Sequence, residues 1–145
     1  MFVGQILAAK PTNHVIVPMD EPVATTARLL HENGGRLALV ADMKNKLQGV
    51  VSTTDIVRAL GQMGSAAARA PVADIMTRDV STCRPEDHVD VALQLMAKRR
   101  VRHLPVIENG LVLGVINLNA ALDFRYREDE LELGEIRKYV FSFGF

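Results

Sequence analysis

The part of the chain best suited to bind a small molecule is residues 49–55, GVVSTTD. Its apolar start predicts a strand, and Ser52, Thr53, Thr54 and Asp55 follow where a helix is predicted to begin. A hydroxyl at this place accepts a hydrogen bond from a free backbone N–H group, and an aspartate favours the first helical turn. The same free N–H groups and hydroxyls can hold an anion. Helix capping and ligand binding are therefore compatible roles for this segment.

A second segment, residues 114–120 with the sequence GVINLNA, repeats this pattern with one change. Asn117 is again a good capping residue, but Ala120 stands where the first segment has Asp55. The structural role is kept and the carboxylate is lost. We therefore expect one competent binding site around Asp55, and a second site that is weak, altered or empty.

Three cationic side chains are candidates for contacting an anionic group. Arg102 and His103 precede the apolar residues LPV, and Arg36 holds the matching place earlier in the chain. They either contact an anionic ligand or lie at solvated strand starts. The run 98–100 is better explained as a solvated helix end, where cations suit the helix dipole.

Motifs for catalysis or metal binding are missing from the sequence. There is no nucleophile–base pair, paired carboxylate motif or Gly-rich phosphate loop at a known spacing. His14, His31 and His88 have no metal-ligand spacing with one another or with Cys83. Cys83 is the single cysteine, which excludes an internal disulfide, and we expect it to be packed. The protein is therefore predicted not to be an enzyme and to hold no metal.

These candidate residues belong to two copies of one repeated unit. Residues 22–42 align with residues 88–108 without a gap, so that Val40 matches Val106. Residues 47–52 likewise align with residues 112–117. The spacing between the copies changes only where loops are expected, as in a duplicated unit with small insertions.

Each copy predicts the same order of elements, βαββα. The first strand is Val15–Val17 or Val80–Cys83. The helix after it has a predicted apolar face, formed by Val23, Ala27 and Leu30 or by Val89, Leu93 and Met96. Two further strands form a hairpin, at residues 37–41 and 49–52 or at residues 104–107 and 114–117. A second helix then closes each unit, beginning near Asp55 or Ala120.

The chain is accordingly predicted to be an α+β protein with four regions. Residues 1–62 form the first repeat, 63–71 a linker, 72–124 the second repeat, and 125–145 a C-terminal helix with an aromatic tail. A unit of this size alone buries little surface, so the two copies are expected to pack together. An interface between like units also creates a cleft, where small ligands bind.

The βαββα order, the residues RHLPV at 102–106 and the segment 49–55 together resemble the CBS domain family, over about residues 3–124. The resemblance is to a stand-alone, bacterial-type tandem pair. It implies two repeats forming a pseudo-twofold sandwich whose cleft binds an adenosine-containing ligand. AMP, ADP or ATP is the expected ligand, with NAD(H) and S-adenosylmethionine as further members of the class.

The same resemblance implies roles for individual residues. The carboxylate of Asp55 would bond the ribose hydroxyls. The phosphates would be approached by the neighbouring hydroxyls and by the cationic residues, namely Ser52, Thr53, Thr54, Arg36, Arg102 and His103. An apolar wall for the adenine would come from the first strand, Val15, Ile16 and Val17.

The C-terminal extension predicts an amphipathic helix over Asp123–Val140, weakened at Gly134. Its apolar residues are Leu122, Tyr126, Leu133, Ile136 and Val140. It either packs on its own domain or crosses to a second subunit, and a homodimer is expected because CBS pairs commonly form one. Alternating residues in the tail Phe141–Phe145 predict an extended segment docked in a groove or on a dimer mate.

Composition excludes several kinds of partner. The 17 basic and 17 acidic residues cancel, so there is no electrostatic signature of nucleic-acid or membrane-surface binding. No apolar run approaches the roughly 18–20 residues that span a bilayer, and the N-terminus lacks signal-peptide features. We expect a cytoplasmic protein. Two functions stay open: a ligand sensor that signals to an unidentified protein, or a ligand-independent dimeric interaction module.

Overall fold

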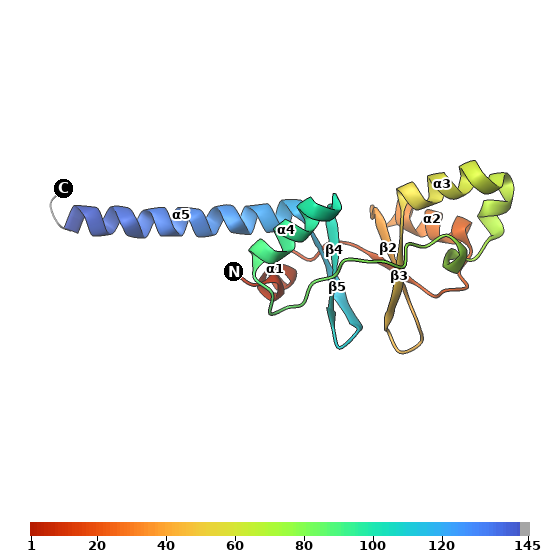
Figure 1. The fold of residues 1–145 in the computed structure, drawn as a ribbon, viewed down its shortest axis with the longest axis horizontal. Coiled ribbons are helices and arrows are strands. Elements are labelled where there is room, and N and C mark those ends of the chain that lie inside the picture. The colour runs from red at the N-terminus through yellow and green to blue at the C-terminus, as the bar shows by residue number, and fades with distance from the viewer. Residues whose placement is uncertain (143–145) are drawn as a thin grey trace.

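The computed structural model describes the backbone of residues 1–142 and the side chains of residues 1–138. It is an α+β fold of two units that lie side by side, with one long helix extending from the second (Figure 1). The α-helices and strands are α1 (Val3–Ala9), β1 (Val15–Val17), α2 (Val23–Glu32), β2 (Leu37–Ala41), β3 (Leu47–Ser52), α3 (Thr53–Met63), α4 (Val89–Arg99), β4 (His103–Glu108), β5 (Leu111–Asn117) and α5 (Leu118–Ser142). Two short 3₁₀ helices, η1 (Gly64–Arg69) and η2 (Val72–Asp74), connect the units.

The first unit is built on a three-stranded sheet in the order β1-β2-β3. β1 runs parallel to β2, and β2 runs antiparallel to β3 with Leu37 opposite Ser52. The central strand is buried from Ala38 to Ala41 because both of its faces are covered. Ala38 and Val40 pack in the core shared with α2, whereas Leu39 faces the second unit. A continuous apolar run is what a strand covered on both faces requires.

The second unit has a two-stranded sheet, β4-β5, in place of the three strands expected. The predicted strand Val80–Cys83 is reduced to a single pairing of Cys83 with Val106. Cys83 N donates to Pro105 O at 3.0 Å, and its own carbonyl accepts from Ile107 N at 2.9 Å. Pro85 follows two residues later and has no N–H group to extend the pairing.

The apolar faces of α2 and α4 differ by one position from the prediction. The structure buries Thr26 and Ala92 where Ala27 and Leu93 were expected. Thr26 tolerates complete burial because its hydroxyl donates to Pro22 O at 3.1 Å. Both helices therefore face their cores through their first, fourth and eighth residues. A short pattern of apolar residues cannot distinguish this face from the predicted one, which used the fifth residue in place of the fourth.

Each repeat sends its N-terminal segment to the other unit. Val3 and Ile6 of α1 lie in the core of the second unit, whereas Val72 and Met76 lie in the core of the first. The crossings are anchored by related backbone bonds, such as Val23 N to Ala70 O and Val89 N to Met1 O, both 2.9 Å. The folded units are thus exchanged relative to the sequence repeats.

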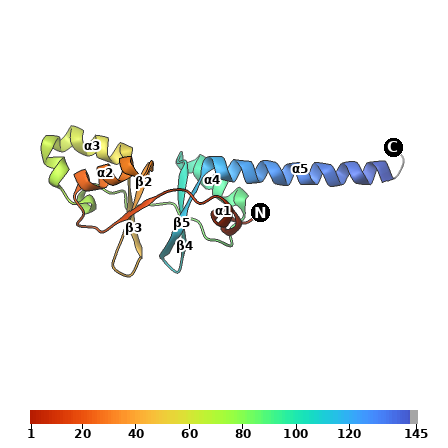
Figure 2. The ribbon, with the colours of Figure 1, turned by 180° about the vertical axis from the view of Figure 1, so that it is seen from behind.

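A small apolar cluster joins the two sheets. Leu39 packs with Val112 and Val115 between the units. The hairpin tips also pair, since Leu47 N donates to Gly110 O and Val112 N donates to Asn45 O, each at 3.1 Å. Figure 2 shows the two hairpins side by side from behind, as Figure 1 does from the front. The pair therefore forms the expected pseudo-twofold sandwich.

Helix α5 joins two elements that the sequence predicted separately. The closing helix of the second repeat and the C-terminal helix form one helix of 25 residues, uninterrupted at Gly134. The backbone of Phe141 and Ser142 continues this helix, in contrast to the extended segment expected there. The rest of the tail and the side chain of Val140 lie outside the described residues. Among the helices that the structure describes, none is long and apolar enough to cross a membrane.

Candidate functional site

The N-terminus of α3 is held by a reciprocal cap between Ser52 and Asp55. Asp55 N donates to Ser52 Oγ at 3.2 Å, and Ser52 N donates to Asp55 Oδ2 at 2.8 Å. Ser52 Oγ also donates to Asp55 Oδ2 at 3.0 Å. This is the capping box expected where a strand ends in a serine followed by an acid in the first helical turn. The capping role inferred for this segment is therefore present in the structure.

The other carboxylate oxygen of Asp55 is bonded from two sides. Thr77 Oγ1 donates to Oδ1 at 3.0 Å, and Arg58 Nη1 lies 3.1 Å from the same atom. Asp55 is only 3% exposed and accepts four hydrogen bonds, which satisfies its carboxylate without a ligand. The Arg58 side chain is about half exposed, so it is the partner that a ribose hydroxyl would replace most easily.

Thr77 reaches Asp55 because its backbone is paired with β3. Val50 N donates to Thr77 O at 2.9 Å, and Thr77 N donates to Val50 O at 2.8 Å. This close approach requires Gly49, since a Cβ atom there would lie 2.8 Å from Thr77 O and 2.8 Å from Met76 Sδ. The glycine of the segment 49–55 therefore admits the chain that supplies a further side chain to the site.

A cavity of about 490 Å³ opens beside this cap. All seven polar residues proposed from the sequence line it, namely Arg36, Ser52, Thr53, Thr54, Asp55, Arg102 and His103. The hydroxyls and the carboxylate come from the first repeat at the N-terminus of α3, whereas Arg102 and His103 come from the second repeat at the start of β4. The fold thus brings both sets of residues to one concave surface, of the size that small ligands occupy.

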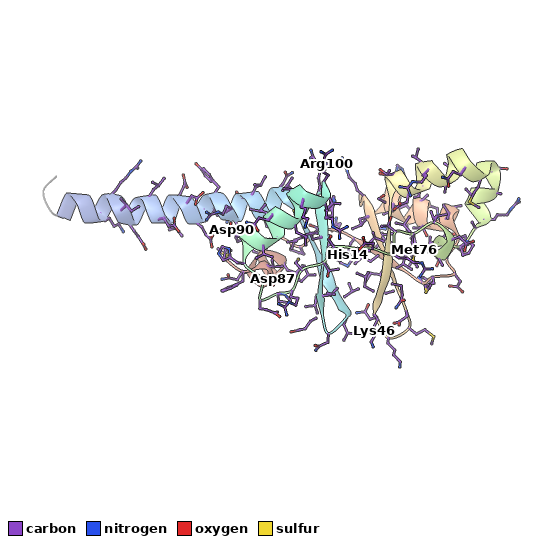
Figure 3. All side chains as sticks on the ribbon, in the orientation of Figure 1. His14, Lys46, Met76, Asp87, Asp90 and Arg100 are labelled. Carbon is purple, nitrogen blue, oxygen red and sulfur yellow. The ribbon has the colours of Figure 1, made fainter. Side chains whose placement is uncertain are left out.

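Sequence reasoning missed two cationic residues of the same cavity, Arg99 and Arg100. Arg100 ends α4 in the left-handed conformation with φ of 55°, at the place where α2 is followed by Gly34 with φ of 62°. Figure 3 shows Arg100 at the end of α4 nearer to the first unit. Arg99 Nη1 pairs with Asp79 Oδ2 at 3.3 Å across the cavity. The alignment of the two repeats matches Arg100 with Gly34, and this match was the signal that could have predicted the left-handed turn at Arg100.

The three residues predicted for an adenine wall are not among those that line the Asp55 cavity. Val15, Ile16 and Val17 line neither cavity, because Val15 and Val17 are buried in the core of the first unit and Ile16 faces away from it. The apolar lining of the Asp55 cavity comes instead from Leu37, Val50, Val80, Val101 and Pro105. Because the units exchange segments, residues 77–81 of the second repeat, and not β1, run past the carboxylate.

His103 lies in a positive environment. Burial lowers its pKa from the ordinary value, and the charges of Arg36 and Arg102 lower it further. The lowered pKa favours a neutral imidazole at neutral pH. An anion at this place would be attracted by both arginines, whose fork of donors suits a phosphate.

The related cavity of the second repeat, about 550 Å³, has a different chemistry. Asn117 caps α5 by accepting from Ala120 N at 2.8 Å, and its Nδ2 donates to Thr12 Oγ1 at 2.8 Å. Ala120 is buried, and no carboxylate is among the residues that line this cavity. The two cavities share three lining residues, Arg36, Arg102 and His103, so the two sites are adjacent there.

Two interlocked βαββα units with ligand-sized cavities at their junction define a duplicated ligand-binding module. A family model for the CBS domain matches residues 3–62 and 72–126, and the chain belongs to this family. The same fold is found in solved structures. A CBS-domain containing protein from Agrobacterium tumefaciens has a TM-score of 0.77 and 29% identity, over 86% of this chain and 99% of that one.

Further matches include two longer proteins and a structure solved with ligands. The chain is 33% identical over 129 residues to the meiotically up-regulated gene 70 protein of Schizosaccharomyces pombe, covering 82% of this chain and 18% of that one. It is 28% identical to a mitochondrial CBS domain-containing protein of Arabidopsis thaliana, covering 76% of this chain and 54% of that one. The chain thus spans about half or less of these two relatives. The CBS domain pair of protein MJ0100, solved with 5-methylthioadenosine and S-adenosyl-L-methionine, has a TM-score of 0.73 and 22% identity, covering 88% and 98% of the two chains.

Metal binding finds no support in the side chains that the structure describes. Within residues 1–138, no group of three or more His, Cys, Asp or Glu side chains is arranged to hold a metal ion. Cys83 is buried, and burial followed by the charge of Asp87 raises its pKa to about 12. The thiol is thus kept protonated and packed.

Proposed function

We propose that this protein is a regulatory module that binds an adenosine-containing nucleotide, AMP, ADP or ATP, in the Asp55 cavity. The observation that carries the proposal is the composition of that cavity: hydroxyls and a carboxylate of the first repeat face cationic residues of the second. A nucleotide needs acceptors for its ribose and donors for its phosphates. Both are present, and each comes from a different repeat.

The ribose would bind at Asp55. Its carboxylate accepts hydrogen bonds from Thr77 and Arg58 in the free protein, and two ribose hydroxyls would take over as donors. Arg58 can move away because its side chain is about half exposed. Of the two cavities described above, the one beside Asp55 offers this acceptor, because Ala120 takes the related position in the second repeat and no carboxylate lines its cavity. The proposal therefore places the nucleoside in the Asp55 cavity.

The phosphates would bind between the start of α3 and the cationic residues. Thr53 and Thr54 are exposed at the N-terminus of α3, where free N–H groups attract an anion. The facing side chains are those of the four arginines Arg36, Arg99, Arg100 and Arg102, together with the neutral imidazole of His103. This cationic excess favours a phosphorylated ligand over adenosine or S-adenosylmethionine, which lack phosphate groups. NAD(H) is the further phosphate-containing candidate.

Regulation would follow from the position of the ligand between the repeats. A nucleotide bonded to both repeats stabilises the arrangement of the units in which the carboxylate and the arginines face one another, and shifts the population of the protein toward it. A partner protein that recognises this arrangement would then respond to the nucleotide. The adenosine derivatives bound by the CBS pair of MJ0100 support the ligand class. The proposed role is binding and signalling, not catalysis.

A ligand-independent interaction module is the second candidate function. The observation in its favour is that Asp55 already has four hydrogen bonds without a ligand. In this case the capping box and the contacts of Thr77 with Val50 and Asp55 would serve only to hold the two units together.

Isothermal titration with adenosine, AMP, ADP and ATP tests the first candidate against the second. We expect binding of the nucleotides, and an Arg102→Gln variant should bind AMP about 10-fold or more weakly because it loses a charged hydrogen bond. Arg28→Gln is the matched control, since Arg28 is an exposed arginine on α2 that lines neither cavity. Absence of binding by all four compounds would favour the interaction module. Equal loss in both variants would contradict the assignment of the site.

A further inference from the structure

Helix α5 carries an apolar stripe that its own chain leaves uncovered. Leu122, Tyr126, Leu133 and Ile136 are 49%, 62%, 53% and 59% exposed. The side of the helix that packs on the second unit is formed by Ala120, Ala121 and Phe124. At about 100° per residue, Ala120 and Phe124 lie nearly opposite this stripe. We call these four exposed side chains the α5 stripe.

The second half of α5 also has no support from the body of the protein. Among the described side chains, Glu128 is the last on the helix that interacts with another element, where it contacts the amino group of Met1 and approaches His88. Beyond it the helix extends away from both units, as both ribbon views show (Figures 1 and 2). A helical segment of this length is marginally stable alone in water. A packing partner would supply what the segment lacks.

We propose that the α5 stripe packs against the α5 stripe of a second copy of this chain, in a parallel two-stranded coiled coil. Positions 122, 126, 129, 133 and 136 are separated alternately by four and three residues, which is the heptad repeat of such a coil. Tyr126 and Leu133 take the a positions, and Leu122 and Ile136 take d positions. The spacing of the exposed residues therefore selects another helix with the same repeat as the occupant.

The charges beside the stripe select the second copy and its direction. In this heptad register Arg125 and Glu132 occupy g positions, while Glu130 and Arg137 occupy e positions. In a parallel pair, each g residue faces the e residue five positions later in the partner. Arg125 then faces Glu130 of the second copy, and Glu132 faces Arg137, so both kinds of contact join opposite charges. An antiparallel pair centred on the stripe would also join Arg125 to Glu132, but it would bring Glu130 close to Glu130 of the second copy, so the parallel pair has the better charge pattern.

Asp129 occupies the remaining d position and limits the strength of the pair. Two aspartates would face one another in the seam, each with Arg125 of its own chain 3.2 Å away as a neutralising partner. A polar residue at a core position costs stability but fixes the register of the two helices. The proposal therefore predicts that Asp129→Leu strengthens the dimer, whereas an unrelated use of α5 would leave association unaffected.

Sedimentation equilibrium of the full chain tests the pairing. We expect a reversible dimer, whose dissociation constant rises about 100-fold or more in Leu133→Glu, because a charge replaces an apolar contact on each side of the seam. Leu131→Glu is the matched control, since Leu131 is 68% exposed on the same helix but lies off the stripe. A monomeric wild-type protein, or a dimer that survives Leu133→Glu unchanged, would overturn the proposal. A monomer would leave the stripe to a different partner.

A cysteine at Tyr126 tests the direction of the helices. In a parallel pair the two residues at position 126 face one another, so Tyr126→Cys should form an interchain disulfide under mild oxidation. Cys83 does not compete, because it is buried. In an antiparallel pair centred on the stripe, residue 126 would lie opposite residue 132, so the two cysteines would be about six residues of helix apart, roughly 9 Å, which is beyond the reach of a disulfide. Failure to cross-link in a chain that sediments as a dimer would overturn the parallel arrangement.

Discussion

Asp55 should contribute to folding and to ligand binding through different contacts, and a variant can separate the two. In Asp55→Ala the Ser52 N–H group loses its acceptor at the junction of β3 and α3. This bond is one half of the capping box, and leaving its N–H group unsatisfied costs about 1–3 kcal/mol. The separate bond from the Thr77 hydroxyl to Asp55 Oδ1 is also lost, which adds about 1 kcal/mol. Arg58 adds little, because water replaces its partner at an exposed site. We expect the free energy of unfolding to fall by about 2–4 kcal/mol.

The second repeat shows how to restore the fold without the acid. There Asn117 caps α5 and bonds to Thr12, with Ala120 at the position of Asp55. The double variant Ser52→Asn, Asp55→Ala transfers this cap to the first repeat, where the new amide would reach residue 55 N–H and Thr77. We expect it to recover about half of the lost stability, or roughly 1–2 kcal/mol. It should not recover nucleotide affinity, because the ribose acceptor is still missing.

Urea unfolding and AMP titration at 25 °C measure the two effects in the same three proteins. The thermal midpoint of Asp55→Ala should fall by about 5–15 °C, so binding must be measured well below it. A loss of less than about 1 kcal/mol in Asp55→Ala would refute the capping argument. Wild-type AMP affinity in the double variant would refute the role of the carboxylate in binding the ribose, while leaving the fold argument intact.

Three further predictions follow from the burial and packing of single residues. Because the pKa of His103 is lowered in the folded state, the unfolded chain binds a proton first as pH falls. Stability should therefore decline below a pH of about 6.5, and His103→Gln should flatten this part of the profile in urea unfolding at pH 5.5 and 7.5. Cys83, with its pKa raised to about 12, should react with Ellman's reagent at pH 8 only as fast as the chain unfolds; rapid reaction of the native protein would contradict its packing. Gly49→Ala should lower the free energy of unfolding by about 1–3 kcal/mol, because its Cβ atom would press on the backbone of Thr77. Gly114→Ala should cost less, because its Cβ atom would meet only the flexible end of the Leu7 side chain. Equal losses in denaturant unfolding would contradict this difference.

Much of the site could be predicted from the sequence because its residues are in contiguous segments. Ser52 and Asp55 form their cap within one turn, so local spacing is sufficient to predict it. The cationic residue that sequence reasoning assigned to solvent, Arg100, enters the cavity through a left-handed turn at the end of α4. Sequence spacing predicts that a helix ends there, but not the direction in which the following side chains point.

The adenine wall shows the opposite case. Val15, Ile16 and Val17 were assigned from their place in the first repeat, as though each repeat built its own cavity. The structure instead passes residues 77–81 of the second repeat beside Asp55, through the backbone pairing of Thr77 with Val50. Which copy supplies a wall depends on how the copies exchange segments, and a repeat alignment carries no information on that exchange.

The sequence by itself determined the duplication, the α+β class, the two capped helix starts and the difference between Asp55 and Ala120. These properties depend on residues close together in the chain, where periodicity and capping preferences act. Only the tertiary structure decided that α1 belongs to the second core, that Arg36, Arg102 and His103 meet between two cavities, and that α5 presents an uncovered apolar stripe. Those properties depend on contacts between distant segments, because burial and electrostatic interaction act through space and not along the chain.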